Sequence, residues 1–213
     1  MRSSAIRSWP SSPRSNAQLS PRGILFVIAG PSGVGKGTVV RRVLQQHPEI
    51  WLSVSVTTRS PRPGEEHGVD YLFVSDGRFD DLVDRGALLE WALVVGHRSG
   101  TPVEPIEREL AAGRDVILEI DVQGARQVKA RVPEAVLVFL APPSMEELER
   151  RLRSRGTEDE EKLALRLATA QEEMGEMGWF DHVVVNECLD EATAQVEAIL
   201  QTSRSPTQGR TPP

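Results

Sequence analysis

The sequence predicts an α/β domain built on a mostly parallel β-sheet, and three observations predict it. Short apolar runs alternate with segments of helical periodicity along most of the chain. The first run, Ile24–Ala29, is apolar throughout, as is typical of a strand that is covered on both faces. A glycine-rich loop follows this run directly and leads into a helical segment, which is the order expected of a phosphate-binding α/β unit.

Length and composition suit one globular domain. The chain has 213 residues, of which 39% are hydrophobic and 26% are charged, and this excludes collagen-like and fully disordered classes. The longest apolar runs have the length of strands, so no membrane-spanning helix is expected. The single cysteine, Cys188, excludes an internal disulfide and a zinc site of several thiolates, and it favours a reducing, cytoplasmic setting.

The two ends of the chain differ from its middle. Residues 1–22 and 202–213 are rich in serine, proline and arginine and contain no acid, so we expect two disordered tails. The first tail also has the composition of an organelle transit peptide, but its prolines interrupt an amphipathic helix. Residues 23–201, the expected domain, hold 19 basic and 31 acidic residues, a net charge of −12. This charge argues against nucleic acid as a partner, so any anion site must be local.

Further helices and strands alternate after the glycine-rich loop. A helix is expected over Thr38–Gln46, because its valines and leucine form one face before Pro48 ends it. The later strands are expected at Val116–Ile120, Ala135–Leu140 and His182–Val185. The later helices are expected at Val103–Ala112, at Met145–Arg153 with the capping pair Ser144 and Glu147, and at Glu160–Met174.

The segment from Leu52 to about Val95 follows a different pattern. Short extended runs at residues 52–56, 71–74 and 88–95 surround a helix near Arg78–Arg85. We therefore expect a small, more antiparallel insertion within the parallel domain.

The glycine-rich loop predicts a site for the phosphates of a nucleotide. Glycines let backbone N–H groups turn toward one anion, the helix N-terminus adds positive potential, and Lys36 can reach the outer phosphates. The strict pattern has Ser or Thr where this chain has Gly37, so Thr38 is the candidate metal-facing hydroxyl, directly or through water. The predicted phosphate-binding residues are Gly30, Pro31, Ser32, Gly33, Val34, Gly35, Lys36, Gly37 and Thr38.

A proline-rich loop at residues 55–71 indicates a second anion site. It presents two arginines three positions apart and ends at the only tyrosine of the chain, and guanidinium groups bind phosphate oxygens in pairs. Taken alone, Arg59 and Arg62 would be better explained as part of an exposed polar loop.

At this second loop the chain resembles the guanylate kinases, which phosphorylate GMP at the expense of ATP. The run Ser-x-Thr-Thr-Arg-x-Pro-Arg-x-Gly-Glu and the following tyrosine carry the resemblance, which extends from about Gly23 to Leu200. It implies a P-loop NTPase fold with a GMP-binding insertion at about residues 53–99 and a helical lid at about residues 151–162. It also implies that the GMP phosphate is held by Ser55, Arg59, Arg62 and Tyr71.

The resemblance assigns the guanine base to Glu90 and Thr101. A carboxylate suits this task because guanine presents two adjacent N–H donors that two carboxylate oxygens accept together. Without the resemblance, Glu90 would be interpreted as a solvent-facing acid on an exposed strand.

The chain departs from the family pattern after this strand. The family often has Tyr-Gly-Thr where this chain has Ser-Gly-Thr, so a tyrosine hydroxyl is missing at Ser99. His97 and Arg98 are the neighbouring candidates, and our hypothesis is that Arg98 replaces the tyrosine.

Two acids end an apolar strand two positions apart, at Glu119 and Asp121, so both point to the same side at the carboxyl edge of the sheet. By resemblance, Asp121 contacts GMP and Glu119 lies near the phosphates and Mg²⁺. One acid at a strand end is common, so direct metal ligation by either residue stays open.

Residues 150–161 form a basic run that turns abruptly acidic, a pattern that usually indicates a solvated helix end. The resemblance instead implies a mobile lid, whose Arg151 and Arg155 close on the phosphates together with Arg166 of the next helix. Gly156 is the candidate hinge. Phosphoryl transfer needs such cations because charge spreads over the transferring oxygens. The predicted catalytic residues are Lys36, Arg151, Arg155 and Arg166, and Asn186 matches a family position near the adenine of ATP.

The predicted reaction is transfer of the terminal phosphoryl group of ATP to GMP with Mg²⁺, without a covalent intermediate. Two alternatives remain: a non-catalytic guanylate-kinase-like binding module, and a kinase for another phosphorylated acceptor. Lys36 and the lid arginines argue against the first, and Glu90 with Thr101 argues against the second. ATP and GMP are the expected ligands and dGMP is a further candidate; no membrane, nucleic acid or protein partner is implied.

Overall fold

The computed structural model describes residues 22–94, 96–154 and 160–204. The described chain forms two compact units. Unit 1 comprises residues 22–25, 51–118 and 123–135, and unit 2 comprises residues 26–50, 119–122 and 136–204. Most of the two expected tails lies outside the described residues, but residues 202–204 belong to the last helix, so the second tail cannot begin at 202.

Unit 2 is built on parallel strands. β1 (Leu25–Ala29) pairs in parallel with β8 (Val136–Ala141), and β8 pairs in parallel with β9 (His182–Val185). Every residue of β1 is buried, as the uninterrupted apolar run predicts. These strands confirm the parallel sheet that the sequence predicts.

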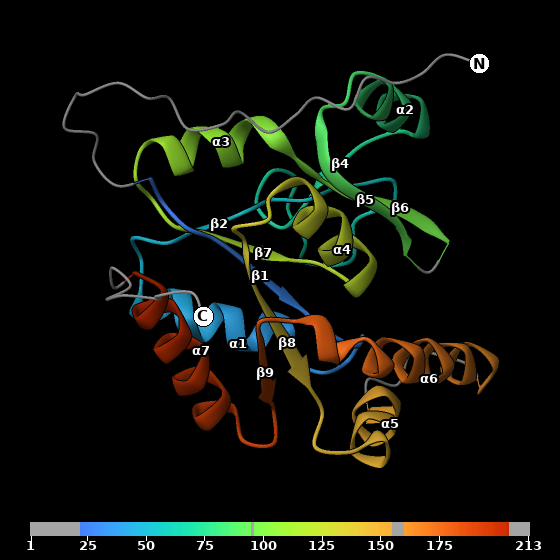
Figure 1. Cartoon of the computed structure of the whole chain (residues 1–213). Helices are drawn as coiled ribbons and strands as arrows, with labels where there is room; N and C mark the ends of the chain where they lie inside the picture. Colours follow the sequence, from blue (N-terminus) through green and yellow to red (C-terminus); the bar gives the residue numbers. More distant parts are fainter. Residues whose placement is uncertain (1–21, 95, 155–159, 205–213) are drawn as a thin grey trace. The chain divides into compact units, whose positions relative to one another are not determined.

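Helices cover the strands of unit 2. α1 (Lys36–Gln46) buries Val39, Val40 and Val43, and it packs beside α7 (Leu189–Arg204) in Figure 1, where the two helices are blue and red. α5 (Met145–Ser154) packs against α6 (Glu160–Gly175), which a short 3₁₀ turn at Met177–Trp179 follows. α7 is a helix that the pattern analysis did not predict.

Unit 1 contains the expected insertion, which is a four-stranded mixed sheet. Its strand order is β4 (Leu72–Phe73), β3 (Val56–Thr57), β6 (His97–Pro102) and β5 (Leu88–Val94). β3 pairs with β4 in parallel, whereas β6 is antiparallel to both β3 and β5. The prediction of a more antiparallel insertion is confirmed.

The limits predicted for one strand of the insertion are wrong. The extended run expected over residues 52–56 is two strands: β2 (Trp51–Leu52), which pairs in parallel with β7 (Val116–Glu119), and β3, which belongs to the mixed sheet. The chain changes sheets between them. Helices α2 (Asp76–Asp84), α3 (Val103–Ala111) and α4 (Val122–Arg131) complete the elements around unit 1, and α4 was not predicted.

Among the helices of residues 22–94, 96–154 and 160–204, none combines the length and the apolar character that a membrane crossing requires.

The mixed sheet and α2 share a hydrophobic core. Its fully buried centre is Phe79 of α2, which packs with Val56 and Leu88 from the sheet. The ring of Phe79 also meets Trp91 edge-on, with 6.2 Å between centroids. This core holds together the strands that carry the predicted guanine-binding residues.

The insertion should therefore unfold more easily in the Phe79→Ala variant than in the wild type. Removing a fully buried phenylalanine ring typically costs about 3–5 kcal/mol, since the surrounding core cannot close the cavity. Urea unfolding followed by circular dichroism measures this loss. Leu93→Ala is the matched control, because Leu93 is 66% exposed on the same sheet, and a surface change of this kind costs less than about 0.5 kcal/mol. Equal unfolding midpoints for the two variants would contradict the assignment of Phe79 to the core.

Candidate active site

The predicted phosphate loop of unit 2 connects β1 to α1 and has the backbone that glycines permit. Gly30, Gly33 and Gly35 have φ angles of 143°, 89° and 101°, a region that other residues rarely adopt. A Cβ at Gly30 would lie 2.2 Å from the carbonyl oxygen of Leu140. Gly35 precedes the first turn of α1, so the positive end of the helix faces the loop.

Lys36 folds back over the loop that carries it. Its Nζ donates hydrogen bonds to the carbonyl oxygens of Gly30 at 2.6 Å and Pro31 at 3.2 Å. The ammonium group is thereby held beside the loop that the sequence predicts to bind phosphate.

Glu119 explains why the chain has glycine at position 37. A Cβ at Gly37 would lie 3.2 Å from Oε2 of Glu119, so the carboxylate occupies the space where the strict pattern places a hydroxyl side chain. Burial raises the pKa of Glu119, while the charges of Lys36 and Arg41 oppose this shift. With the exposed hydroxyl of Thr38 on the first turn of α1, Glu119 supplies oxygen donors of the kind that Mg²⁺ prefers.

Two of the predicted catalytic arginines contact the phosphate loop from other elements. Arg166 of α6 donates to Oγ of Ser32 at 2.6 Å, and Arg151 of α5 donates to the carbonyl oxygen of Val34 at 3.3 Å. Arg155 lies outside the described residues. The structure thus brings Lys36, Arg151 and Arg166 together at one loop.

Glu147 holds Arg151 in place. The backbone N–H of Glu147 donates to Oγ of Ser144 at 3.2 Å, which confirms the Ser144 half of the predicted capping pair. Its carboxylate accepts hydrogen bonds at 2.7 Å from Arg150 and from Nε of Arg151. These two arginines lower the pKa of Glu147 to about 2, so the carboxylate stays ionised at neutral pH.

Asn186 is buried against the same loop. Its Nδ2 donates to the carbonyl oxygen of Val34 at 2.7 Å, and its side chain leaves no room for a Cβ at Gly35. The sequence placed Asn186 near adenine, and it did not predict this contact.

One acid near the phosphate loop, Glu173 of α6, was not predicted from the sequence. Burial raises its pKa to about 7, and the charges of Asp121 and Glu172 add to the shift, whereas Lys36 and a hydrogen bond from the N–H of Val122 oppose it. Helical spacing could have indicated its burial, because Glu173 lies three residues after the buried Ala170 on the same helix.

In unit 1, one carboxylate organises the predicted phosphate-binding arginines. Arg59 donates two hydrogen bonds to Glu65, at 2.8 and 2.9 Å, and the backbone N–H of Arg62 donates to the same carboxylate at 2.7 Å. The guanidinium of Arg59 lies 5.2 Å from the centroid of the Tyr71 ring. Ser55 is half-buried at the start of this loop, and Arg62 is exposed.

The predicted guanine-binding pair is assembled across two strands. Thr101 and Glu90 are register partners on β6 and β5, and the Thr101 hydroxyl donates to Oε1 of Glu90 at 2.5 Å. An irregularity in the register between Leu88 and Glu90 interrupts the alternation of the strand and leaves Glu90 only 3% exposed. The interpretation of Glu90 as a solvent-facing acid is therefore wrong.

The hypothesis that Arg98 replaces the missing tyrosine loses its support. Its guanidinium donates to Asp80 at 2.5 Å and to Asp76 at 2.7 Å, and it lies 4.9 Å from the centroid of the Phe79 ring. These contacts anchor β6 to α2. Arg98 is thus engaged in holding the insertion together.

Comparisons with known proteins identify the family that this chain resembles over most of its length. A family model described as guanylate kinase matches residues 22–203. A guanylate kinase of Synechococcus sp. (strain CC9902) is 56% identical over 183 residues, which are 86% of this chain and 98% of that protein. A guanylate kinase of Thermobifida fusca (strain YX) is 55% identical over 83% of this chain and 90% of that protein. The crystal structure of guanylate kinase from Anaplasma phagocytophilum matches with a TM-score of 0.75 at 34% identity, covering 89% of this chain and 90% of that one.

Glu173→Gln should make stability less dependent on pH. A carboxyl that binds its proton more tightly in the folded state destabilises that state as pH rises from the unfolded pKa of 4.5 toward the folded pKa of about 7. The neutral amide keeps an oxygen to accept the Val122 N–H. We expect the variant to be more stable by about 1 kcal/mol at pH 8, after allowance for solvent screening, and by much less at pH 5.

Urea titrations at the two pH values measure this effect. Glu161→Gln is the control, because Glu161 is exposed in the first turn of the same helix. An equal gain in the two variants, or the same gain at both pH values, would contradict the prediction.

Proposed function

The chain belongs to the guanylate kinase family, and on this premise we propose how its residues transfer the terminal phosphoryl group of ATP to GMP, giving ADP and GDP. The observation that carries the proposal is the convergence of cations from three elements on one glycine-rich loop: Lys36 of α1, Arg151 of α5 and Arg166 of α6. Donor and acceptor are both anions, so their reaction requires positive charge at the point where they meet.

The phosphate loop would bind the β- and γ-phosphates of ATP. Backbone N–H groups of the loop and the N-terminus of α1 would supply donors, and Lys36 would supply a compact charge for the outer phosphates. Arg151 and Arg166 would offset the charge that spreads over the transferring oxygens. Asn186 would lie near the adenine.

The acceptor would be held by residues of the mixed sheet and its loops. The guanidinium groups of Arg59 and Arg62, with the hydroxyls of Ser55 and Tyr71, would bind the phosphate of GMP. Glu90 would accept the ring N–H and amino group of guanine beside Thr101. Asp121 would contact GMP from the end of β7, and dGMP remains a candidate acceptor.

A magnesium ion fits the oxygen donors near the loop. Thr38 and Glu119 would hold it, directly or through water, because a hydroxyl and a carboxylate lie next to the phosphate site. When bound, the ion would neutralise charge on the phosphate oxygens and orient them.

The segment 151–162 would act as a lid that excludes water during transfer, with Arg155 as its further catalytic arginine. A covalent intermediate is not required, since the phosphate of GMP is already nucleophilic at neutral pH and needs mainly to be positioned. We expect the reaction to take place in the cytoplasm.

A nucleotide panel tests the proposed reaction. ADP release from ATP and Mg²⁺ is measured by a coupled assay with GMP, AMP, CMP and UMP offered in parallel. We expect turnover with GMP, and a loss of at least about a hundredfold in Lys36→Ala, because the outer phosphates lose their charged donor. Folded protein that binds GMP but turns over no acceptor would instead support a binding module, and turnover with another nucleotide would indicate a different kinase.

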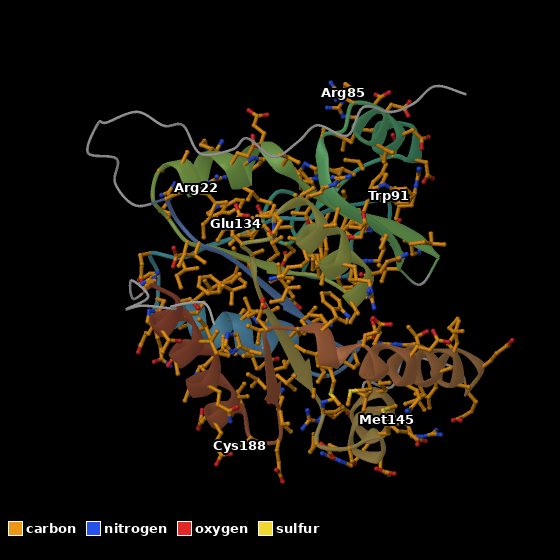
Figure 2. The ribbon with its side chains drawn as sticks, viewed as in Figure 1. Arg22, Arg85, Trp91, Glu134, Met145 and Cys188 are labelled. Carbon is orange, nitrogen blue, oxygen red and sulfur yellow. The ribbon has the colours of Figure 1, made fainter. Side chains whose placement is uncertain are left out.

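Glu90→Gln tests the recognition of guanine. The carboxamide replaces one acceptor with a donor, so one guanine N–H loses its partner, and kcat/KM for GMP should fall by about a hundredfold. The kinetics are compared with those of Glu134→Gln, an exposed acid of unit 1 that Figure 2 labels. The proposal for Glu90 fails if both variants keep the activity of the wild type with GMP.

A further inference from the structure

Asn186 is held by hydrogen bonds at both its backbone and its side chain, and the side chain bonds to the phosphate loop. It directly follows β9, and its backbone N–H donates to the carbonyl oxygen of Ala141 at 2.8 Å. Its side chain is 6% exposed, and Nδ2 donates to the carbonyl oxygen of Val34 at 2.7 Å. A buried amide with this short bond fixes the position of the carbonyl that it meets.

The carbonyl of Val34 has a second donor that depends on the same residue. Nη1 of Arg151 donates to it at 3.3 Å, and Nη2 of Arg151 donates to the backbone oxygen of Asn186 at 3.0 Å. The carboxylate of Glu147 accepts a hydrogen bond from Nε of the same guanidinium. Asn186 is therefore both a direct partner of the loop and a support for the arginine that reaches it.

The orientation of this one carbonyl determines what the loop presents to an anion. In a trans peptide the C=O and the following N–H point in opposite directions. When the Val34 oxygen is held toward Asn186, the N–H of Gly35 faces the opposite side of the loop. Gly35 has a φ of 101° and is the residue before the first turn of α1, where successive N–H groups form an anion-binding concavity.

We propose that Asn186 is a positioning residue of the phosphate loop, which orients the Gly35 N–H toward the phosphates of ATP by holding the carbonyl of Val34. This inference rests on the proposed function, in which the loop binds those phosphates. It differs from a contact with adenine, since it concerns the affinity of the loop for phosphate itself.

Inorganic tripolyphosphate separates the two roles because it has phosphates and no base. Its dissociation constant is measured by calorimetry for the wild type and for Asn186→Ala, beside that of ATP. Loss of a positioning hydrogen bond should weaken both ligands by about tenfold. A contact with adenine alone would weaken ATP and leave tripolyphosphate unchanged, and that result would overturn the inference.

Two further variants complete the experiment. Asn186→Asp keeps the shape of the side chain but places a carboxylate oxygen against the Val34 carbonyl, so it should weaken tripolyphosphate at least as much as Asn186→Ala. Cys188→Ala is the control, since Cys188 is exposed two residues further along, as Figure 2 shows, and both affinities should stay at the wild-type value. Circular dichroism and GMP binding establish that each variant is folded.

The outcomes separate the inference from the proposed function. Suppose that the wild type binds both ligands, and that Asn186→Ala and Asn186→Asp bind tripolyphosphate as tightly as the wild type does. The positioning role is then wrong, and the proposed function stands. If the wild type binds neither ATP nor tripolyphosphate, both are wrong.

Discussion

The chemistry of unit 2 depends on how closely other elements approach the backbone of the phosphate loop. Each of four glycines would bring an added Cβ within 3.2 Å of a different neighbour: Gly30 of Leu140 in β8, Gly33 of Leu152 in α5, Gly35 of Asn186 after β9, and Gly37 of Glu119 in β7. The loop is thus shaped from outside, by segments that are distant in sequence. This close approach favours glycine even at Gly37, whose φ is not positive. It also links the site to the sheet, because three of the four neighbours lie on strands or directly after one.

Carboxylates prepare the cationic groups of the site before any substrate binds. Glu147 holds Arg151, and Glu65 holds Arg59 together with the backbone of Arg62. Each pairing fixes a long side chain, and if these arginines bind phosphate as we propose, fixing them beforehand lowers the entropic cost of binding. The acid at Glu90 is itself prepared by Thr101. Arginines held by a neighbouring carboxylate therefore occur in both units.

Sequence patterns predicted the features that depend on local order and missed those that depend on distant partners. The uninterrupted apolar run of β1 and the loop after it are local, so both were predictable. β6 was not predicted as a strand, because its residues are mostly polar or small and it forms through backbone pairing with β3 and β5. The bond between Asn186 and Val34 joins residues 152 positions apart, and the side-chain pattern on either side does not indicate it. The family resemblance predicted Glu90 and Thr101 as the guanine-binding pair. It did not predict that Glu90 is buried, because the burial accompanies an irregular register of β5 that the sequence pattern does not indicate.

Two carboxyl groups near Lys36, those of Glu119 and Glu173, can offset part of its positive charge. Lys36 lies close enough to Glu119 and Glu173 to oppose the rise that burial causes in the pKa of both carboxyls. If both acids were fully ionised, they would reduce the positive potential that an incoming triphosphate meets. A pKa of about 7 means that Glu173 is partly protonated at neutral pH, so its negative charge opposes the phosphates only in part. An anion that approached Lys36 would raise the pKa of Glu173 further and favour its neutral form. Partial protonation of Glu173 therefore leaves more of the positive charge of Lys36 for the phosphates that, in the proposed function, the loop binds.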